Sequence, residues 1–137
     1  MIRLIPALFA LAACAGCAAM SAQSESRSLD TTLVAYANVV RWGDMSQAIP
    51  FLDPEWLKQH PLTHLDLERY KQIHVAAYTE QPPVPAGPHE VRQVVQIDLV
   101  NVNTQTSRSI VDNQLWRYDE KDKHWRLMSG LPDITQH

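Results

Sequence analysis

The sequence predicts an α+β fold in which N-terminal helices pack on a curved, four-stranded antiparallel sheet. Apolar residues recur at helical spacing up to about residue 68, and at every second position from there to about residue 129. The strands follow one another without helices between them, and the charged loop at residues 119–123 is typical of a hairpin. This segregation favours one antiparallel sheet covered by helices over an alternating parallel sheet.

The first predicted helix covers residues 29–42. Ser28 is its candidate N-cap, and Gly43 follows the last apolar position as a C-cap signal. One face of the helix carries an apolar stripe that is expected to pack on the sheet. The stripe consists of Leu29, Leu33, Tyr36 and Val40.

Three short helical pieces are expected next, each opened by a capping residue. Asp44 and Asp53 are candidate N-caps, and Pro54 suits the first helical position after Asp53. Thr63, with Asp66 three residues later, matches a capping signature. The three pieces are expected to cover about residues 45–51, 54–60 and 64–68.

Four strands follow, separated by segments that cannot continue a sheet. The first connection is rich in proline, which has no N–H for a central ladder, and is expected to be a loop. The second is a polar turn and the third is the charged hairpin loop. The predicted strands are residues 70–80, 90–102, 109–118 and 124–129, and the proline-rich loop is residues 81–88.

The N-terminal segment carries a targeting signal. Arg3 precedes a short apolar run that is too short to span a bilayer as a helix but fits the apolar part of a signal peptide. The run closes on a leucine, two alanines and Cys14, which resembles the lipobox of bacterial lipoproteins, whose cysteine is lipidated and becomes the mature N-terminus. Cys17 is the alternative lipidation site. An ordinary secretory signal, cleaved after Ala15 or Ala18, is the alternative to a lipoprotein.

The lipobox resemblance implies a division of the chain and a location. The expected parts are a signal peptide at residues 1–13, a lipidated cysteine with a flexible tether at 14–28, a folded domain at 29–133 and a disordered tail at 134–137. The tether is predicted from its small polar residues. The implied location is the bacterial cell envelope. Ala15, where an aspartate would favour the inner membrane in enteric lipoproteins, favours the outer membrane facing the periplasm.

Composition restricts the partners of the mature domain. Removal of residues 1–13 takes away one of the twelve basic side chains and leaves fifteen acidic ones, a formal charge of −4. A weakly acidic domain has no electrostatic reason to bind nucleic acid or an anionic bilayer, so membrane contact is expected through the lipid. Both cysteines precede the predicted domain, which must therefore be stabilised by packing without a disulfide.

Residues 29–132 resemble the nuclear transport factor two-like, or cystatin-like cone, superfamily. The resemblance rests on Arg-Trp-Gly-Asp at residues 41–44, Phe-Leu-Asp-Pro at 51–54, and the pair Leu-Trp-Arg-Tyr at 115–118 and Trp-Arg-Leu at 125–127. It implies a cone-like domain. The superfamily includes isomerases, dehydratases, polyketide cyclases and non-enzymatic binding modules, so the resemblance does not choose a function.

A cone of this kind can enclose a pocket, and the predicted strands carry acid–base residues. The candidates are His74, Asp98 and Asp112, with Tyr36, Tyr78 and Trp116 as an aromatic wall. The competing interpretation places the polar residues on the outer, solvated face of the sheet. No catalytic role is assigned to any of them.

Other site types find little support. His60 and His64 have the four-residue spacing of two metal ligands on one helix, but Pro61 between them argues against a continuous helix, so no metal site is predicted. The domain has no recognisable activated nucleophile and no glycine-rich phosphate loop, and no cofactor is predicted.

The sequence therefore favours a non-catalytic binding or assembly module held at the membrane by its lipid. Its expected partner is a protein or a small apolar ligand. The alternatives are an isomerase- or dehydratase-type enzyme with an acid–base pocket, and a structural accessory that forms homodimers.

Overall fold

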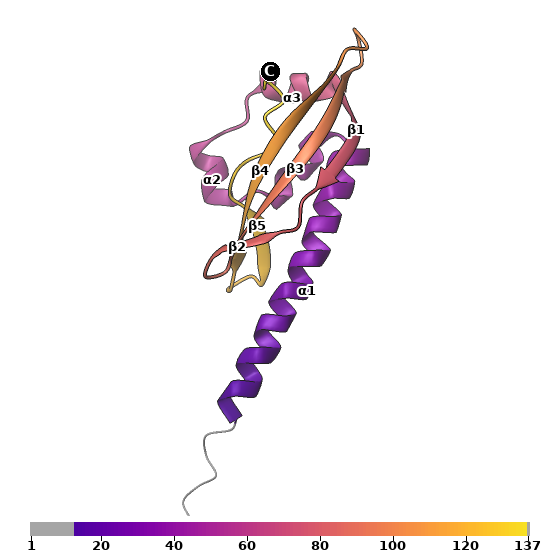
Figure 1. Ribbon diagram of the computed structural model, residues 1–137. Helices are drawn as coiled ribbons and strands as arrows, with labels where there is room; N and C mark the ends of the chain where they lie inside the picture. Colours follow the sequence, from indigo (N-terminus) through magenta and orange to yellow (C-terminus); the bar gives the residue numbers. More distant parts are fainter. Residues whose placement is uncertain (1–12, 137) are drawn as a thin grey trace, which may run out of the picture.

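The computed structural model describes residues 13–136 and shows helices packed on a strongly curled antiparallel sheet (Figure 1). This confirms the predicted α+β, cone-like arrangement. The helices come first, and the strands follow without a helix between them. The elements are α1 (Ala13–Trp42), η1 (Met45–Phe51), α2 (Pro54–Gln59), α3 (His64–Lys71), β1 (Ile73–Glu80), β2 (Val84–Gly87), β3 (Glu90–Asn101), β4 (Ser107–Asp119) and β5 (His124–Leu127).

The sheet has the strand order β1-β3-β4-β5, and every neighbouring pair is antiparallel. The short strand β2 pairs with the beginning of β3. The proline-rich segment is therefore not only a loop, which corrects the sequence-based expectation. Pro85 is accommodated because β2 is bonded on one side only, so the N–H that proline lacks is not needed for a second neighbour.

The core lies between α1 and the concave face of β3 and β4. Side chains of these strands alternate between buried and exposed, as a one-sided sheet requires. The predicted apolar stripe of α1 is buried against this face, which confirms it. The inward residues are Leu29, Leu33, Tyr36 and Val40 from α1, Val95, Ile97 and Leu99 from β3, and Ile110, Asp112, Gln114 and Trp116 from β4.

Three of the four predicted N-caps are confirmed, whereas Ser28 lies inside α1, which begins at Ala13, and is not a cap. The side chains of Asp44, Asp53 and Thr63 each accept a hydrogen bond from a backbone N–H in the first turn that follows. Thr63 and Asp66 form a reciprocal capping box. This box starts a helix that runs to Lys71, beyond the single turn expected, so the first strand begins at Ile73.

The helix α1 begins well before residue 29, which corrects the expectation of a flexible tether at residues 14–28. Alanines at its start favour the helix, and tertiary contacts hold the following turns. Trp125 Nε1 donates to the backbone oxygen of Glu25 at 3.1 Å, and His89 Nδ1 donates to the Glu25 carboxylate at 2.9 Å. Composition alone could not reveal these contacts, because both partners lie far along the chain.

The predicted disordered tail at residues 134–137 is also corrected. Ile134 is 6% exposed and belongs to the hydrophobic core, and Arg108 donates to its backbone oxygen. Gln136 is hydrogen-bonded to the backbone of Val111. The domain therefore extends to Gln136. The predicted signal peptide lies outside the described residues except for Ala13, and within residues 13–136 no helix has both the length and the apolar character needed to cross a membrane.

His89 joins α1 to the hairpin between β4 and β5. Its two ring nitrogens lie 2.9 Å from carboxylate oxygens of Glu25 and Glu120. The hydrogen bond to Glu25, with the negative charges of both carboxylates, raises the pKa of His89 above its ordinary value. Because the folded pKa is raised, the clamp is fully present below pH about 6.5 and is lost as the pH rises through the folded pKa.

We expect His89→Asn to loosen the beginning of α1. Asparagine tolerates the positive φ of 57° at this position but cannot bridge both carboxylates. Amide hydrogen exchange in residues 19–28 is therefore expected to be faster in the variant at pH 6, and the wild type is expected to approach the variant at alkaline pH. His74→Asn, at an exposed residue of β1, is the control. Equal exchange in the variant and the wild type at pH 6 would contradict the clamp.

Candidate functional site

The structure brings together four of the six residues predicted to line a pocket. Tyr36, Tyr78, Asp112 and Trp116 converge between α1 and the concave face of the sheet. The other two lie elsewhere. His74 is exposed on β1, and Asp98 is half-buried on β3, where it accepts a hydrogen bond from Ser109 on β4.

Gln114 connects this interior cluster, and sequence reasoning missed it. Its Nε2 donates to Asp112 Oδ2 and to the Tyr78 hydroxyl, each at 2.9 Å. Its Oε1 accepts from Trp116 Nε1 at 3.0 Å. A signal was present in the sequence, because residues 112, 114 and 116 are separated by two positions and therefore share a face of the strand.

Asp112 is the titratable centre of the cluster. Burial raises the pKa of its carboxyl group to about 6, and the hydrogen bond from Gln114 opposes that rise. Burial also raises the pKa of Tyr36 and of Tyr78, and the negative charge of Asp112 adds to both shifts. The carboxyl group can therefore exchange a proton near neutral pH while the two phenols stay protonated.

The cluster is packed as part of the core. Tyr36 meets Trp116 edge-to-face with ring centroids 5.2 Å apart, and it meets Phe51 in the same way at 5.4 Å. The Tyr36 hydroxyl is buried without a hydrogen-bond partner among the described residues. None of the four cavities found in the described part of the chain is lined by Asp112.

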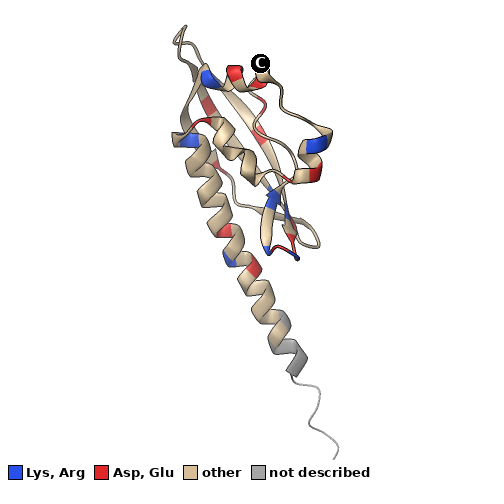
Figure 2. Cartoon of the chain, turned by 180° about the vertical axis from the view of Figure 1, so that it is seen from behind, with Lys and Arg blue, Asp and Glu red and all other residues tan. Residues whose placement is uncertain are grey.

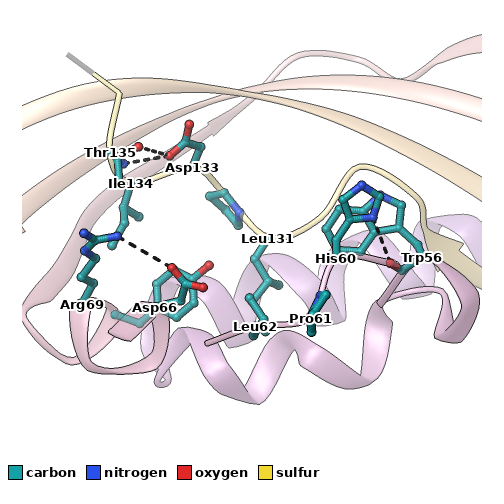
Figure 3. A pocket seen from close by; sticks show the side chains of 12 residues that line it. Trp56, His60, Pro61, Leu62, Asp66, Arg69, Leu131, Asp133, Ile134 and Thr135 are labelled. Atoms are coloured by element: carbon teal, nitrogen blue, oxygen red, sulfur yellow. Dashed lines mark hydrogen bonds and ion pairs between the residues drawn. The ribbon is translucent and has the colours of Figure 1, made fainter. Parts of the chain in front are cut away.

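A surface groove of about 260 Å³ lies between the α2–α3 region and the C-terminal segment (Figure 3). At one end His60 stacks on Trp56 with ring centroids 4.4 Å apart, and His60 Nδ1 donates to the backbone oxygen of Trp56. At the other end Arg69 Nη1 lies 3.8 Å from Asp66 Oδ1. Between the two ends, Figure 3 shows the apolar side chains of Leu62 and Leu131, and Ile134 lies at the Arg69 end.

Gly130 allows the C-terminal segment to form one wall of this groove. Its φ is +80°, and a Cβ at this position would lie 2.5 Å from Cη2 of Trp56. Only glycine therefore lets the chain turn across the indole ring without displacing it. After this turn, Leu131 and Ile134 line the groove together with residues of α3.

The groove is suited to binding more than to metal chemistry. It combines a flat aromatic end, an apolar middle and a pair of opposite charges, which is the composition of ligand and peptide sites. Within the described residues, no group of three or more His, Cys, Asp or Glu side chains is placed to hold a metal ion. His60 and His64 do not share a helix, since α2 ends before His60 and α3 begins at His64.

Neither family models, nor curated protein sequences, nor solved structures match this chain.

Proposed function

We propose that this protein is a lipid-anchored protein of the bacterial cell envelope whose cone-like domain binds a partner in the groove beside Trp56. The proposal includes membership of the nuclear transport factor two-like superfamily. The observation that carries it is the shape of α1, one continuous helix that starts beside the candidate lipidation site and ends inside the domain.

The first turns of α1 project from the domain as a stalk (Figure 1). Among the side chains of this helix that the structure describes, the first buried one is Leu29, and Cys17 is exposed on the projecting part. The helix already contacts the rest of the domain at Glu25, and at 1.5 Å per residue the eleven-residue rise from Cys14 to Glu25 spans about 16 Å. A lipid on Cys14 would thus hold the domain at a fixed distance from the bilayer surface.

The groove lies toward the opposite end of the domain. Its walls include α3 and the C-terminal segment, which Figure 1 places far from the first turn of α1. An anchored molecule would present the groove to the periplasm and away from its own membrane. Its apolar middle suits a small apolar ligand or an apolar side chain of a protein partner.

Charge also supports attachment through lipid. Figure 2 shows acidic and basic residues scattered over the helices and the sheet. The formal charge of the full chain is −3. Electrostatic attraction to an anionic bilayer is therefore weak, and an acyl chain is the stronger means of attachment.

We expect Cys14→Ser to abolish incorporation of radiolabelled palmitate and to move the protein from the membrane fraction to the soluble periplasmic fraction. Serine cannot form the thioether to which the lipid is attached. Cys17→Ser is the matched control and should leave both readouts unchanged. Continued labelling of Cys14→Ser together with loss of labelling in Cys17→Ser would move the anchor to Cys17. Labelling of neither the wild type nor the variants would refute the anchor.

A second candidate function is acid–base catalysis of the isomerase or dehydratase type. Two observations favour it. Burial raises the pKa of the Asp112 carboxyl group to about 6, and the buried Tyr36 hydroxyl has no hydrogen-bond partner within residues 13–136. An aspartate base with a nearby phenol is the arrangement used by isomerases of the cone-like superfamily. This function requires the aromatic cluster to open, because Tyr36 and Trp116 pack against each other beside Asp112.

A further inference from the structure

The free edge of β4 carries an unusual contact. β5 pairs only with residues 116–119 of β4. Just beyond β5, the backbone N–H of Leu115 donates a hydrogen bond to the Ser129 hydroxyl, and the N–H of Met128 donates to the backbone oxygen of Leu115. From Ser107 to Asn113 no strand pairs with this edge within the described residues. The C-terminal segment passes along the edge, and one of its side chains makes the contact.

That side chain is Gln136, whose amide takes the place of a peptide group. The backbone N–H of Val111 donates to Gln136 Oε1 at 3.2 Å, and Gln136 Nε2 donates to the backbone oxygen of Val111 at 3.0 Å. These are the two hydrogen bonds that one residue of a neighbouring antiparallel strand would exchange with Val111. The edge is therefore already shaped to bind a peptide backbone.

The contact occupies only the middle of the edge. Backbone groups alternate in direction along a strand, so Ser109 and Asn113 present theirs to the same side as Val111. Among residues 13–136 these outward groups have no partner. The side chains of Ser109, Val111 and Asn113 are exposed and uncharged, so the edge lacks the lysines that commonly prevent strand addition.

We propose that this edge of β4 binds an extended segment of a partner protein, which displaces Gln136 and adds a strand to the sheet. The segment is uncharged, and it places a β-branched residue opposite Val111, which is 46% exposed on the outer face. Ile134 stays in the core, so only the residues beyond it have to move.

A partner segment suits the edge better than a second copy of this chain. Two β4 strands paired antiparallel are related by a two-fold axis that reverses the strand direction. Figure 1 shows α1 running alongside the strands and projecting beyond one end of the sheet. The two stalks of such a dimer would point in opposite directions, and both could not enter one membrane. The preference for a partner over a second copy rests on the proposed anchor. The observation that the edge is exposed does not depend on the anchor.

The test uses the full-length protein in detergent micelles and a labelled synthetic peptide of alternating threonine and valine with blocked ends. Fluorescence anisotropy is expected to show saturable binding. Gln136→Ala should tighten binding by roughly tenfold, because two hydrogen bonds no longer have to be broken first. Val111→Pro should abolish it, because proline removes the central outward donor. Val111→Thr, which keeps the donor and the branched side chain, should bind as the wild type does.

A second measurement does not depend on any variant. In the wild-type protein the peptide should slow amide hydrogen exchange at Ser109, Val111 and Asn113, and leave β1, the opposite edge of the sheet, unchanged. Slowing at β1, or equal binding by Val111→Pro and Val111→Thr, would overturn the proposal. Light scattering is applied to the wild type and to Val111→Pro. A dimer that is present in the wild type and lost in Val111→Pro would show that the edge binds a second copy of this chain and not a partner protein. None of these readouts depends on lipidation, so the anchor and the edge can fail separately.

Discussion

Asp112→Asn is expected to stabilise the protein at neutral pH by about 1–3 kcal/mol. Asp112 is 7% exposed, and its charged form must be kept within the aromatic interior of the domain. Burial raises the pKa of its carboxyl group from 3.8 to about 6. At 1.36 kcal/mol per pKa unit, this shift lowers the free energy of unfolding by up to about 3 kcal/mol when the group is charged. Asparagine has no charge to bury and keeps an acceptor for Gln114 Nε2.

The sign of the pH dependence follows from this raised pKa. Between about pH 4 and pH 6 the folded protein binds the proton of Asp112 more tightly than the unfolded chain does. The contribution of Asp112 to the free energy of unfolding therefore falls as the pH rises through this window, and it is constant above it. The variant should show the same stability as the wild type near pH 4 and a growing advantage up to about pH 7.

Urea denaturation at a series of pH values measures this difference. Asp98→Asn is the matched control, because Asp98 lies half-buried on the same sheet but outside the interior cluster, and its variant should show no such advantage. If Asp112→Asn were less stable than the wild type at pH 8, the carboxylate would have a partner that compensates its burial. That outcome would favour the acid–base function.

Trp116→Ala is expected to cost about 3–5 kcal/mol, the largest loss from a single side chain in this domain. Trp116 is fully buried and contacts both Tyr36 and Phe51 edge-to-face. Its removal leaves a cavity between α1 and β4 and deprives Gln114 Oε1 of its donor. A loss of this size is a large part of the 5–15 kcal/mol that stabilises a typical domain.

The loss would appear as a lower urea midpoint together with a weaker near-ultraviolet circular dichroism signal. Tyr36→Phe is the control within the same cluster. It keeps the ring and removes a hydroxyl that has no hydrogen-bond partner in the described part of the chain, so stability should be unchanged or rise by about 1 kcal/mol. A loss below 1 kcal/mol for Trp116→Ala would mean that the cluster is loosely packed and able to open.

Local signals predicted the elements well where the determining residues are close in sequence. The caps at Asp44, Asp53 and Thr63 depend on contacts over two or three residues, and all three form. Alternation assigned the two faces of β3, because successive side chains of a strand must point to opposite sides. The structure places Asp98 on the face opposite Val95, Ile97 and Leu99, which separates it from the pocket that it was predicted to line.

Long-range contacts account for what the sequence did not predict. The early start of α1 depends on His89 and Trp125, and the ordered C-terminal segment depends on Arg108 and Val111. The groove joins α2 and α3 to residues 131–135, and no local pattern relates these segments. Gln114 could be recognised as the centre of the polar cluster only when Tyr78 from β1 was placed beside it.

The sequence by itself determined the α+β class, the order of helices and strands, the caps of the three short helices and the buried face of α1. Each of these follows from residues that are close in sequence, either within one or two helical turns or at every second position of a strand. Only the tertiary structure decided that Asp112 is buried while His74 is exposed, that the serine-rich segment continues the first helix, and that Gln136 occupies the edge of β4. These outcomes depend on interactions between residues far apart in the chain. Such interactions contribute to stability only after folding has brought the two residues together.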